Sequence, residues 1–460
     1  MSAKPVIAIF DIGKTNKKVF LFDENYRIVS EKTTRLTETI DDDGEPCENL
    51  QSLEQFILGS LDEILKQRDF LIKAINFSAY GASFVHIDDK GEPVAPLYNY
   101  LKNYPPELQE QFYNQYGGKA KMARETSSPV LGNLNSGMQL YYIKYQKPDL
   151  FARIRYSLHL PQYLSYLLTG KPKADITSIG CHTGLWDFRK NRYHDWVYKE
   201  DLDEIFPPIV DSDSVFPAKA QGSNYVVGIG LHDSSAALIP YLVNFNEPFV
   251  LISTGTWCIS LNPFNHTPTT DQDLANDCLC YMQYKGNPVK ASRLFAGNEH
   301  EVQVKRIAAY FNVGTEVFKS IQHDPAIIRK LKFSQNSESA NSSWQECAFA
   351  KRALNDFANY TETYHQLMLD IMEQQYYSTS LVIHGTKVSR IFVDGGFSKN
   401  LVYMNLLAKA FPKLEIFAAS MAQATAVGAA IAIHHCWNPK TLPADIRELK
   451  YYSAPHAAAI

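Results

Sequence analysis

A short polar turn near the start of the chain carries the residue types that hold a metal-bound phosphate. The apolar run Val6–Phe10 stops at Asp11, and Gly13, Lys14 and Thr15 follow before a second apolar run begins. We therefore expect a strand, a tight turn and another strand. Gly13 lets the backbone turn sharply and lets a ligand come close. The turn offers a carboxylate, a cation, a hydroxyl and free backbone N–H groups, which suit a phosphate with its divalent cation.

The same order of elements returns in the second half of the chain. The apolar run Phe249–Ile252 leads into a turn with Thr254, Gly255 and Thr256, and a further apolar run starts at Trp257. A repeat spaced by about half the chain predicts two related domains, each with one phosphate-binding hairpin. Two unrelated hairpins are the simpler alternative.

A polar break between two apolar stretches gives the expected domain boundary. Residues Val243–Pro248 are mostly polar and end in proline. A chain of 460 residues is long enough for two or three domains. We therefore expect one domain over residues 1–245 and a second over residues 246–460.

Paired glycines follow a predicted strand in the second half. The strand Ile391–Val393 ends before Gly395 and Gly396, and a helical pattern begins near Ser398. Two glycines let a flat or phosphorylated ligand lie against bare backbone at a helix N-terminus. An ordinary strand-to-helix turn, which needs only one glycine, is the alternative. The small-residue segment 424–432 is expected to form a helix that packs close to a sheet or to an adenine ring.

The carboxylate best placed for chemistry is Asp233. A strand runs into glycines at Val226–Gly230, and His232 and Asp233 then open a helical pattern. Asp233 at or near the N-cap could serve only to accept backbone N–H groups. Alternatively, a carboxylate that faces a cleft can accept the proton of an attacking hydroxyl during phosphoryl transfer.

Composition and motif content exclude several classes of protein. A net charge of −4 and a pI near 6.4 give no basic footprint for nucleic acid and no polybasic membrane patch. No window approaches a signal peptide or a membrane span. Seven scattered cysteines indicate free thiols, and Cys278 and Cys280 lack a second pair at zinc-site spacing. No Walker-type loop and no G-x-G-x-x-G after the first strand are present. We expect a cytoplasmic protein.

Taken together and in this order, the four segments resemble the FGGY carbohydrate kinases, a branch of the actin/hexokinase/Hsp70 ATPase superfamily. Their first phosphate loop usually reads Asp-x-Gly-Thr-Thr/Ser-Ser-x-Arg. Four residues match that pattern: Asp11, Gly13, Thr15 and Lys18. Lys14 and Asn16 depart from it, which marks the chain as an outlying member whose phosphate contacts can differ.

The resemblance implies a fold, cofactors and site residues. The fold would be α/β, with two actin-like (ribonuclease H-like) domains, mixed five-stranded sheets flanked by helices, and a cleft between the domains. The sugar would bind to the first domain and MgATP mostly to the second, with Asp11 on the Mg²⁺ side and Asp233 as the catalytic base. The implied ATP-binding residues are Gly13, Lys14, Thr15, Thr254, Gly255, Thr256, Gly395, Gly396, Phe397 and Asn400. The implied substrate-binding residues are Tyr80, Gly81, Ala82, His232 and Asp233. The partners would be a small sugar and ATP, and a homodimer is compatible with the sequence.

The substrate is indicated by one departure from the family. Most members show Trp-x-Asp-x-Arg where this chain has Tyr98-Asn-Tyr-Leu-Lys102, so a carboxylate is missing and a lysine replaces the arginine. The Tyr-x-Tyr pattern and His232 before the base are closer to the rhamnulokinases. A more apolar pocket would suit a 6-deoxy ketose such as L-rhamnulose or L-fuculose, whose methyl group needs no hydrogen bond. L-ribulose and D-xylulose are alternatives.

Two other functions remain open at this point. A non-catalytic sugar or nucleotide sensor could use the same scaffold, although it would usually lose the base. An actin- or Hsp70-like ATPase that acts on protein would consume ATP without sugar. The presence of both Asp11 and Asp233 favours a kinase over either one.

Overall fold

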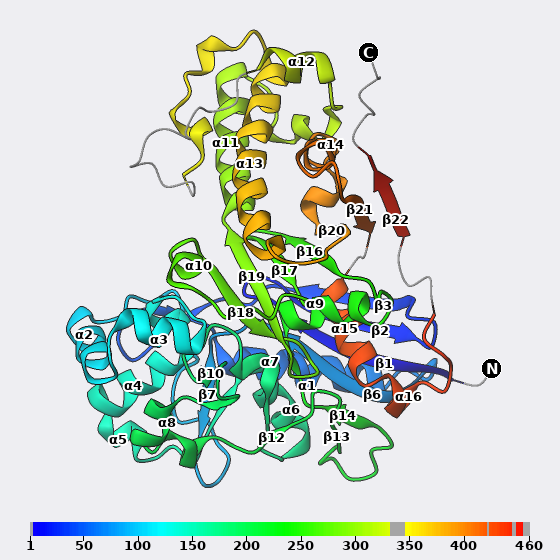
Figure 1. Cartoon of the computed structure of the whole chain (residues 1–460). Helices are drawn as coiled ribbons and strands as arrows, with labels where there is room; N and C mark the ends of the chain where they lie inside the picture. The colour runs from blue at the N-terminus through cyan, green and yellow to red at the C-terminus, as the bar shows by residue number, and fades with distance from the viewer. Residues whose placement is uncertain (1–2, 332–345, 421–422, 444–447, 454–460) are drawn as a thin grey trace.

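The computed structural model describes residues 3–331, 346–420, 423–443 and 448–453. These residues form two α/β lobes, each built on one mixed β-sheet with helices packed against it (Figure 1). The predicted two-domain α/β architecture is confirmed. The predicted strand number is wrong, because each sheet has seven strands and not five. The first sheet includes three strands of only two or three residues (215–217, 226–228 and 231–232), and the second sheet has five-residue strands at both edges (278–282 and 448–452).

The first sheet has the strand order β13-β14-β6-β1-β2-β3, with β15 also paired to β6. Its strands are β1 (Lys4–Ile12), β2 (Lys17–Asp23), β3 (Ile28–Thr34), β6 (Phe70–Ala79), β13 (Val215–Pro217), β14 (Val226–Gly228) and β15 (Leu231–His232). Strand β1 is antiparallel to β2 and parallel to β6. The run Val6–Phe10 is buried on both faces, as expected for a central strand covered by helices on each side.

The second sheet repeats this arrangement. Its order is β18 (Cys278–Met282), β19 (Pro288–Leu294), β17 (Cys258–Asn262), β16 (Phe249–Thr254), β20 (Arg390–Gly395), β21 (Glu415–Ser420) and β22 (Glu448–Tyr452). Strand β16 is antiparallel to β17 and parallel to β20, as β1 is to β2 and β6. Each of these hairpins has its turn where the sequence predicted it.

Helices and short strand pairs complete the two lobes. The helices of the first half are α1 (Leu50–Leu65), α2 (Pro106–Gln115), α3 (Lys119–Thr126), α4 (Ser136–Gln146), α5 (Pro148–Phe151), α6 (Leu160–Thr169), α7 (Ile176–Ile179), α8 (Asp195–Lys199) and α9 (Asp233–Leu242). Those of the second half are α10 (Asp271–Ala275), α11 (Ala296–Phe311), α12 (Pro325–Lys330), α13 (Tyr360–Ile383), α14 (Leu401–Ala410), α15 (Ala424–Ala432) and α16 (His434–Trp437). The short strands are β4 (Thr39–Ile40), β5 (Pro46–Cys47), β7 (Phe84–Ile87), β8 (Tyr156–His159), β9 (Ala174–Asp175), β10 (Trp186–Asp187), β11 (Arg192–Tyr193) and β12 (Ile209–Val210). Among the described helices, none is long and apolar enough to cross a membrane.

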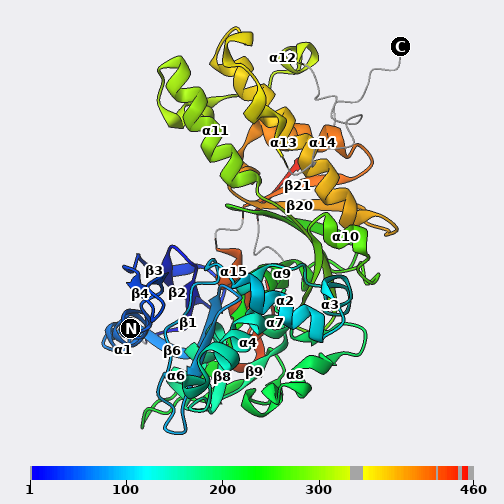
Figure 2. The same ribbon diagram turned by 90° about the vertical axis from the view of Figure 1, so that its left-hand side faces the viewer.

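Helix α15 comes from the end of the chain but packs in the first lobe (Figures 1 and 2). Its buried alanines share one core with Ile7, Ile9 and the α9 helix. A Cβ atom on Gly428 would lie 1.8 Å from the backbone oxygen of Ala236, so only glycine permits this approach of α15 to α9. Of the two expected neighbours of the small-residue helix, a sheet and an adenine ring, the structure therefore shows the sheet.

The two lobes also meet through strand β18. The Ser235 hydroxyl on α9 donates a hydrogen bond to the backbone oxygen of Met282 at 2.8 Å. Near the other end of α9, the Tyr241 hydroxyl lies 3.3 Å from the Asp394 carboxylate on β20. Helix α9 is thus tied to the second sheet near both of its ends.

Candidate active site

Three parallel strands of the first sheet bring the predicted catalytic residues to one edge. Strand β6 lies between β1 and β15, so that Asp11 is opposite Ser78 and His232 is opposite Ala79. Because parallel strands end at the same edge, Asp11 and Asp233 emerge at one edge of the sheet, on either side of β6, and close enough for their charges to interact. In open α/β sheets this edge is where ligands bind.

Asp11 is a half-buried carboxylate in an environment that suits a cation. Burial raises its pKa to about 6, the hydroxyl of Thr425 lowers it, and the charge of Asp233 raises it again. The Lys18 cation lowers it to a smaller extent. Asp11 and Asp233 together carry more negative charge than the nearby Lys18 balances. A divalent cation that prefers oxygen ligands would balance the excess.

Asp233 is the first residue of α9, and one of its oxygens is available to a ligand. The N-cap is His232, whose side chain makes no capping bond, so Asp233 lies directly after the N-cap, within the range that the sequence predicted. Oδ1 of Asp233 accepts a hydrogen bond from the Ser234 N–H at 2.6 Å. No hydrogen bond to Oδ2 occurs among the described residues. About a third of the side chain is exposed, so the carboxylate is not consumed by capping.

His232 is a buried imidazole next to this carboxylate. Its Nε2 lies 3.2 Å from Oδ1 of Asp233 and 3.1 Å from Sγ of Cys181. Burial lowers the pKa of His232, so the ring is neutral and Nε2 carries the proton that it donates. Its Nδ1 is then an acceptor, and this buried atom has no hydrogen-bond partner in the described part of the chain. A substrate hydroxyl would satisfy it.

The segment after β6 forms the wall beside His232. A Cβ atom on Gly81 would lie 2.9 Å from a ring carbon of His232, so the two residues are in close contact. Ala82 has a positive φ of +62°, and its carbonyl accepts a hydrogen bond from Gln139 at 2.6 Å. The buried Tyr80 ring lies 5.9 Å from that of Tyr100. The five expected substrate residues thus come from two neighbouring segments of the sheet edge.

Tyr100 is a residue of this site that the sequence interpretation did not include. Burial and then the negative charge of Asp233 raise the pKa of its hydroxyl to about 12. Its position next to the carboxylate depends on the loop after β7. The only sequence signal was the Tyr-x-Tyr pattern, which says nothing about where the second ring points.

The first phosphate turn is supported by a lysine that the sequence interpretation also missed. The buried Lys17 Nζ donates to the carbonyl of Gly13 at 3.1 Å, to that of Lys14 at 3.0 Å and to Glu48 at 2.8 Å. Lys14 itself pairs with the Glu38 carboxylate at 3.1 Å, and Thr15 is exposed. In this structure the cation inside the turn is therefore Lys17, whereas Lys14 lies on the surface.

The second phosphate turn is joined to the glycine pair after β20. The Thr254 hydroxyl donates to the carbonyl of Asp394 and accepts a hydrogen bond from the N–H of Phe397 at 3.0 Å. Gly395 has a φ of +86°, and a Cβ atom there would lie 1.9 Å from the Thr254 carbonyl. A Cβ atom on Gly297 would lie 1.8 Å from the carbonyl of Gly255. The turn at Thr254 and Gly255 thus lies too close to Gly395 and to Gly297 for any residue with a Cβ atom at either glycine.

A cavity of about 700 Å³ opens beside these glycines. Five of the expected ATP-binding residues line it: Thr254, Gly255, Gly396, Phe397 and Asn400. The other lining residues were not anticipated: Gly297, His300, Glu301, Phe318, Lys319, Ile321, Lys399 and Leu401. Thr256, Gly395 and the first-lobe residues Gly13, Lys14 and Thr15 do not line it. The helix after β20 also begins later than expected, at Leu401, with Asn400 as its N-cap and a 3₁₀ turn before it.

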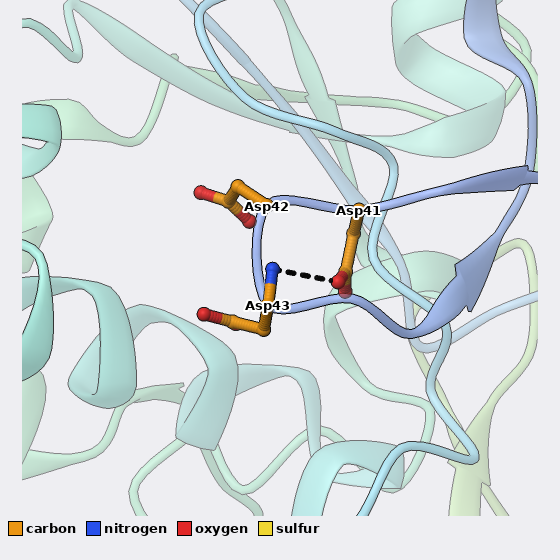
Figure 3. A group of neighbouring side chains, drawn as sticks. All are labelled: Asp41, Asp42 and Asp43. Carbon is orange, nitrogen blue, oxygen red and sulfur yellow. Dashed lines mark hydrogen bonds between the residues drawn. The ribbon is translucent and has the colours of Figure 1, made fainter.

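The substituted Tyr98–Lys102 segment contacts a cluster of three carboxylates, Asp41, Asp42 and Asp43. Figure 3 shows these three aspartates. Lys102 pairs with Asp41 at 2.7 Å and with Asp43 at 2.6 Å, and Lys147 pairs with the second and third aspartates. The Tyr98 hydroxyl donates to Asp42 at 2.8 Å. Two lysines thus balance most of the charge of this loop, and Lys102 is held by protein carboxylates.

Family models match both halves of the chain. Residues 6–239 match the FGGY family of carbohydrate kinases, N-terminal domain, and residues 246–441 match the carbohydrate kinase FGGY, C-terminal domain. A carbohydrate kinase from Novosphingobium aromaticivorans is similar in structure at 24% identity and a TM-score of 0.77, with 97% of this chain and 96% of that one covered.

Two further solved structures share the fold at lower identity. The ligand-bound xylulose kinase from Lactobacillus acidophilus has 18% identity and a TM-score of 0.80 over 98% of this chain and 94% of its own. The Plasmodium falciparum glycerol kinase with ADP has 16% identity and a TM-score of 0.73 over 95% and 90%. Together with the two domain matches, the fold and the paired phosphate turns show that this chain belongs to the FGGY family of carbohydrate kinases.

Proposed function

We propose that this kinase transfers the γ-phosphoryl group of MgATP to a hydroxyl of a ketose, with Asp233 as the general base. The observation that carries this proposal is the position of Asp233 beside Asp11 at the carboxyl edge of β1, β6 and β15. Its second oxygen is available to the hydroxyl that attacks. Phosphoryl transfer mainly needs positioning and charge neutralisation, and a carboxylate can accept the hydroxyl proton as the new bond forms.

Asp11 is the residue that would hold Mg²⁺, with the metal's remaining positions filled by phosphate oxygens and water. The hard carboxylate and the excess negative charge around it fit this ion. When bound, Mg²⁺ neutralises phosphate charge. The turn that contains Gly13, Lys14 and Thr15 would approach the phosphates from the first lobe through its backbone N–H groups.

The nucleotide would occupy the cavity of the second lobe. Its size is within the range of small-molecule sites, and bare backbone at Gly255 and Gly396 gives phosphates and a flat base close access. Thr254 fixes the turn through its two hydrogen bonds. Thr256 and Gly395, which lie next to the lining residues, would complete the phosphate contacts when the lobes close.

The sugar would bind next to His232, with Tyr80, Gly81 and Ala82 along one side. The unpartnered Nδ1 of His232 would accept one sugar hydroxyl, and the ring of Tyr100 adds an apolar surface near the base. The neighbouring rings of Tyr80 and Tyr100 favour a 6-deoxy ketose, such as L-rhamnulose or L-fuculose, phosphorylated at its primary hydroxyl. L-ribulose and D-xylulose are the second candidates, because one similar structure is a xylulose kinase.

A coupled assay of ADP release over a panel of sugars tests this function. The panel contains L-rhamnulose, L-fuculose, L-ribulose, D-xylulose and glycerol, and Asp233→Asn is the matched inactive control. We expect sugar-dependent turnover that the variant loses. Binding of sugar and ADP without turnover would indicate a sensor instead, and ATP hydrolysis that no sugar changes would indicate an ATPase of another class.

A further inference from the structure

His300 is a buried imidazole at the wall of the nucleotide cavity. It lies on α11, is only 8% exposed and lines the cavity. Its ring is fixed by edge contacts with Phe318, at 4.9 Å between ring centroids, and with Phe397, at 5.2 Å. Both phenylalanines also line the cavity. The ring therefore has one defined orientation, and the question is which of its two nitrogens carries the proton.

A chain of hydrogen bonds answers this question. Oδ1 of Asn400 accepts a hydrogen bond from the Tyr403 N–H as the cap of α14, so the amide nitrogen of Asn400 faces Tyr364. That nitrogen donates to the Tyr364 hydroxyl at 2.7 Å. The hydroxyl is almost fully buried, and the other partner the structure gives it is Nε2 of His300 at 3.0 Å. Its proton must go to this nitrogen, because a buried hydroxyl without an acceptor would be costly.

The proton of the neutral ring is then on Nδ1. Burial lowers the pKa of His300 to about 4, so the ring is uncharged at neutral pH. In the described part of the chain, no residue accepts a hydrogen bond from Nδ1. The result is a pre-oriented N–H donor at the cavity wall, between the apolar rings of Phe318 and Phe397.

We propose that His300 is a nucleotide-positioning residue whose Nδ1–H donates a hydrogen bond to an acceptor atom of the nucleoside. The inference rests on the proposed nucleotide site and adds the group that orients the ligand within it. The acceptor is either a ring nitrogen of the base or an oxygen of the ribose, since both offer a lone pair to a neutral N–H donor. The Asn400 cap and Tyr364 act through His300 by setting its tautomer.

Binding of ADP to the full chain, measured by calorimetry without sugar, tests the proposal. We expect His300→Leu to weaken ADP binding about fivefold to tenfold, the size of one lost hydrogen bond. His300→Asn should restore most of the affinity, because an asparagine amide nitrogen lies near the position of Nδ1. Val302→Ala, at a half-exposed position two residues further along α11 and on the other side of the helix, is the control for changes in the helix and should bind like the unchanged protein.

Two further measurements test the tautomer and the acceptor. The ¹⁵N spectrum of His300 should show a protonated Nδ1 in the unchanged protein and a mixture in Tyr364→Phe, with a smaller loss of ADP affinity than in His300→Leu. Two analogues identify the acceptor: 7-deaza-ADP lacks a ring nitrogen of the base, and 2′-deoxy-ADP lacks an oxygen of the ribose. The analogue without the acceptor should bind the unchanged protein more weakly than ADP does. His300→Leu should bind that analogue and ADP with equal affinity.

The outcomes separate this inference from the proposed reaction. Equal ADP affinity of His300→Leu and the unchanged protein would overturn the inference even if the kinase is active. Equal weakening in His300→Leu and His300→Asn would also overturn it, because packing and not the donor would then matter. A protein that phosphorylates none of the sugars but still shows the expected losses of ADP affinity would support the inference and contradict the proposed reaction.

Discussion

The side-chain nitrogen of Lys17 lies 2.8 Å from Oε2 of Glu48, and both side chains are almost fully buried. The same nitrogen donates to two carbonyls of the first phosphate turn. The turn that we propose to bind the phosphates is thus supported by a buried ion pair. Removal of one partner from a buried ion pair is costly, because the other charge then stays buried without a counter-charge.

Lys17→Met should therefore destabilise the protein strongly. We expect the free energy of unfolding to fall by about 3–5 kcal/mol, since Glu48 is left buried without a counter-charge. The double variant Lys17→Met/Glu48→Met should recover a large part of this loss. Urea denaturation of the three proteins measures both effects. A double variant that is less stable than the single one would contradict the assignment of the loss to the unpaired carboxylate.

Replacement of Asp233 tests the base directly. Asp233→Asn keeps the size of the side chain but removes its ability to accept a proton, so kcat should fall by about 10²–10⁴-fold. ADP affinity should not change, because Asp233 does not line the nucleotide cavity. The coupled assay gives kcat and calorimetry gives the affinity. Turnover near that of the unchanged enzyme would remove Asp233 from the mechanism.

Gly81→Ala tests the contact between the β6 turn and His232. The added methyl group would lie 2.9 Å from the imidazole and must displace it from Asp233. We expect kcat/KM for the sugar to fall by about 10²-fold, because small misplacements of reacting groups are costly, while ADP binding stays the same. Steady-state kinetics with varied sugar measure this. An unchanged KM and kcat would show that His232 does not need its present position.

Two helical glycines form a matched pair for the packing of α15 on α9. Gly428→Ala would place a methyl group 1.8 Å from a backbone oxygen of α9 and should lower the free energy of unfolding by about 2–3 kcal/mol. Gly59→Ala in α1 meets nothing within 4 Å and should leave stability unchanged or raise it by up to about 1 kcal/mol. Thermal unfolding compares the two variants. Equal shifts in both would contradict the close approach of the helices.

Asp175 predicts a pH dependence of stability. Its carboxylate is fully buried, and burial raises the pKa from 3.8 to about 6, although the hydroxyls of Ser212 and Thr177 partly offset this. A raised folded-state pKa favours the protonated form. The stabilisation of the folded protein by protonated Asp175 is therefore fully present below about pH 4, and it is lost as the pH rises through 6.

Asp175→Asn removes the charge that causes this loss. Relative to the unchanged protein, the variant should gain stability between pH 4.5 and pH 7.5, by up to about 3 kcal/mol for a shift of two pKa units. Urea denaturation at the two pH values measures the difference. A difference that does not change with pH would contradict the raised pKa. Asp175 also supports the candidate site. It accepts a hydrogen bond from the Thr177 hydroxyl, which in turn accepts one from the backbone N–H of His232 at 3.0 Å.

The sequence alone determined the parts of the site that are local in the chain. The run Val6–Phe10 and the glycine turn after it fixed the first hairpin, and the repeat at Phe249–Thr256 fixed the second, because strand and turn preferences act over a few residues. The position of Asp233 after a strand and at the start of a helix followed in the same way. These segments also carried the resemblance to the FGGY family.

The tertiary structure decided which distant residues meet these segments. No local pattern shows that α15 packs in the first lobe, that Lys17 and not Lys14 lies inside the phosphate turn, or that Tyr100 lies near Asp233. His300 lines the proposed nucleotide cavity because α11 begins against the turn at Gly255, and α13 supplies Tyr364 to fix its ring. Such contacts depend on the packing of residues far apart in the chain, where burial and hydrogen-bond satisfaction select one arrangement that local preferences leave open.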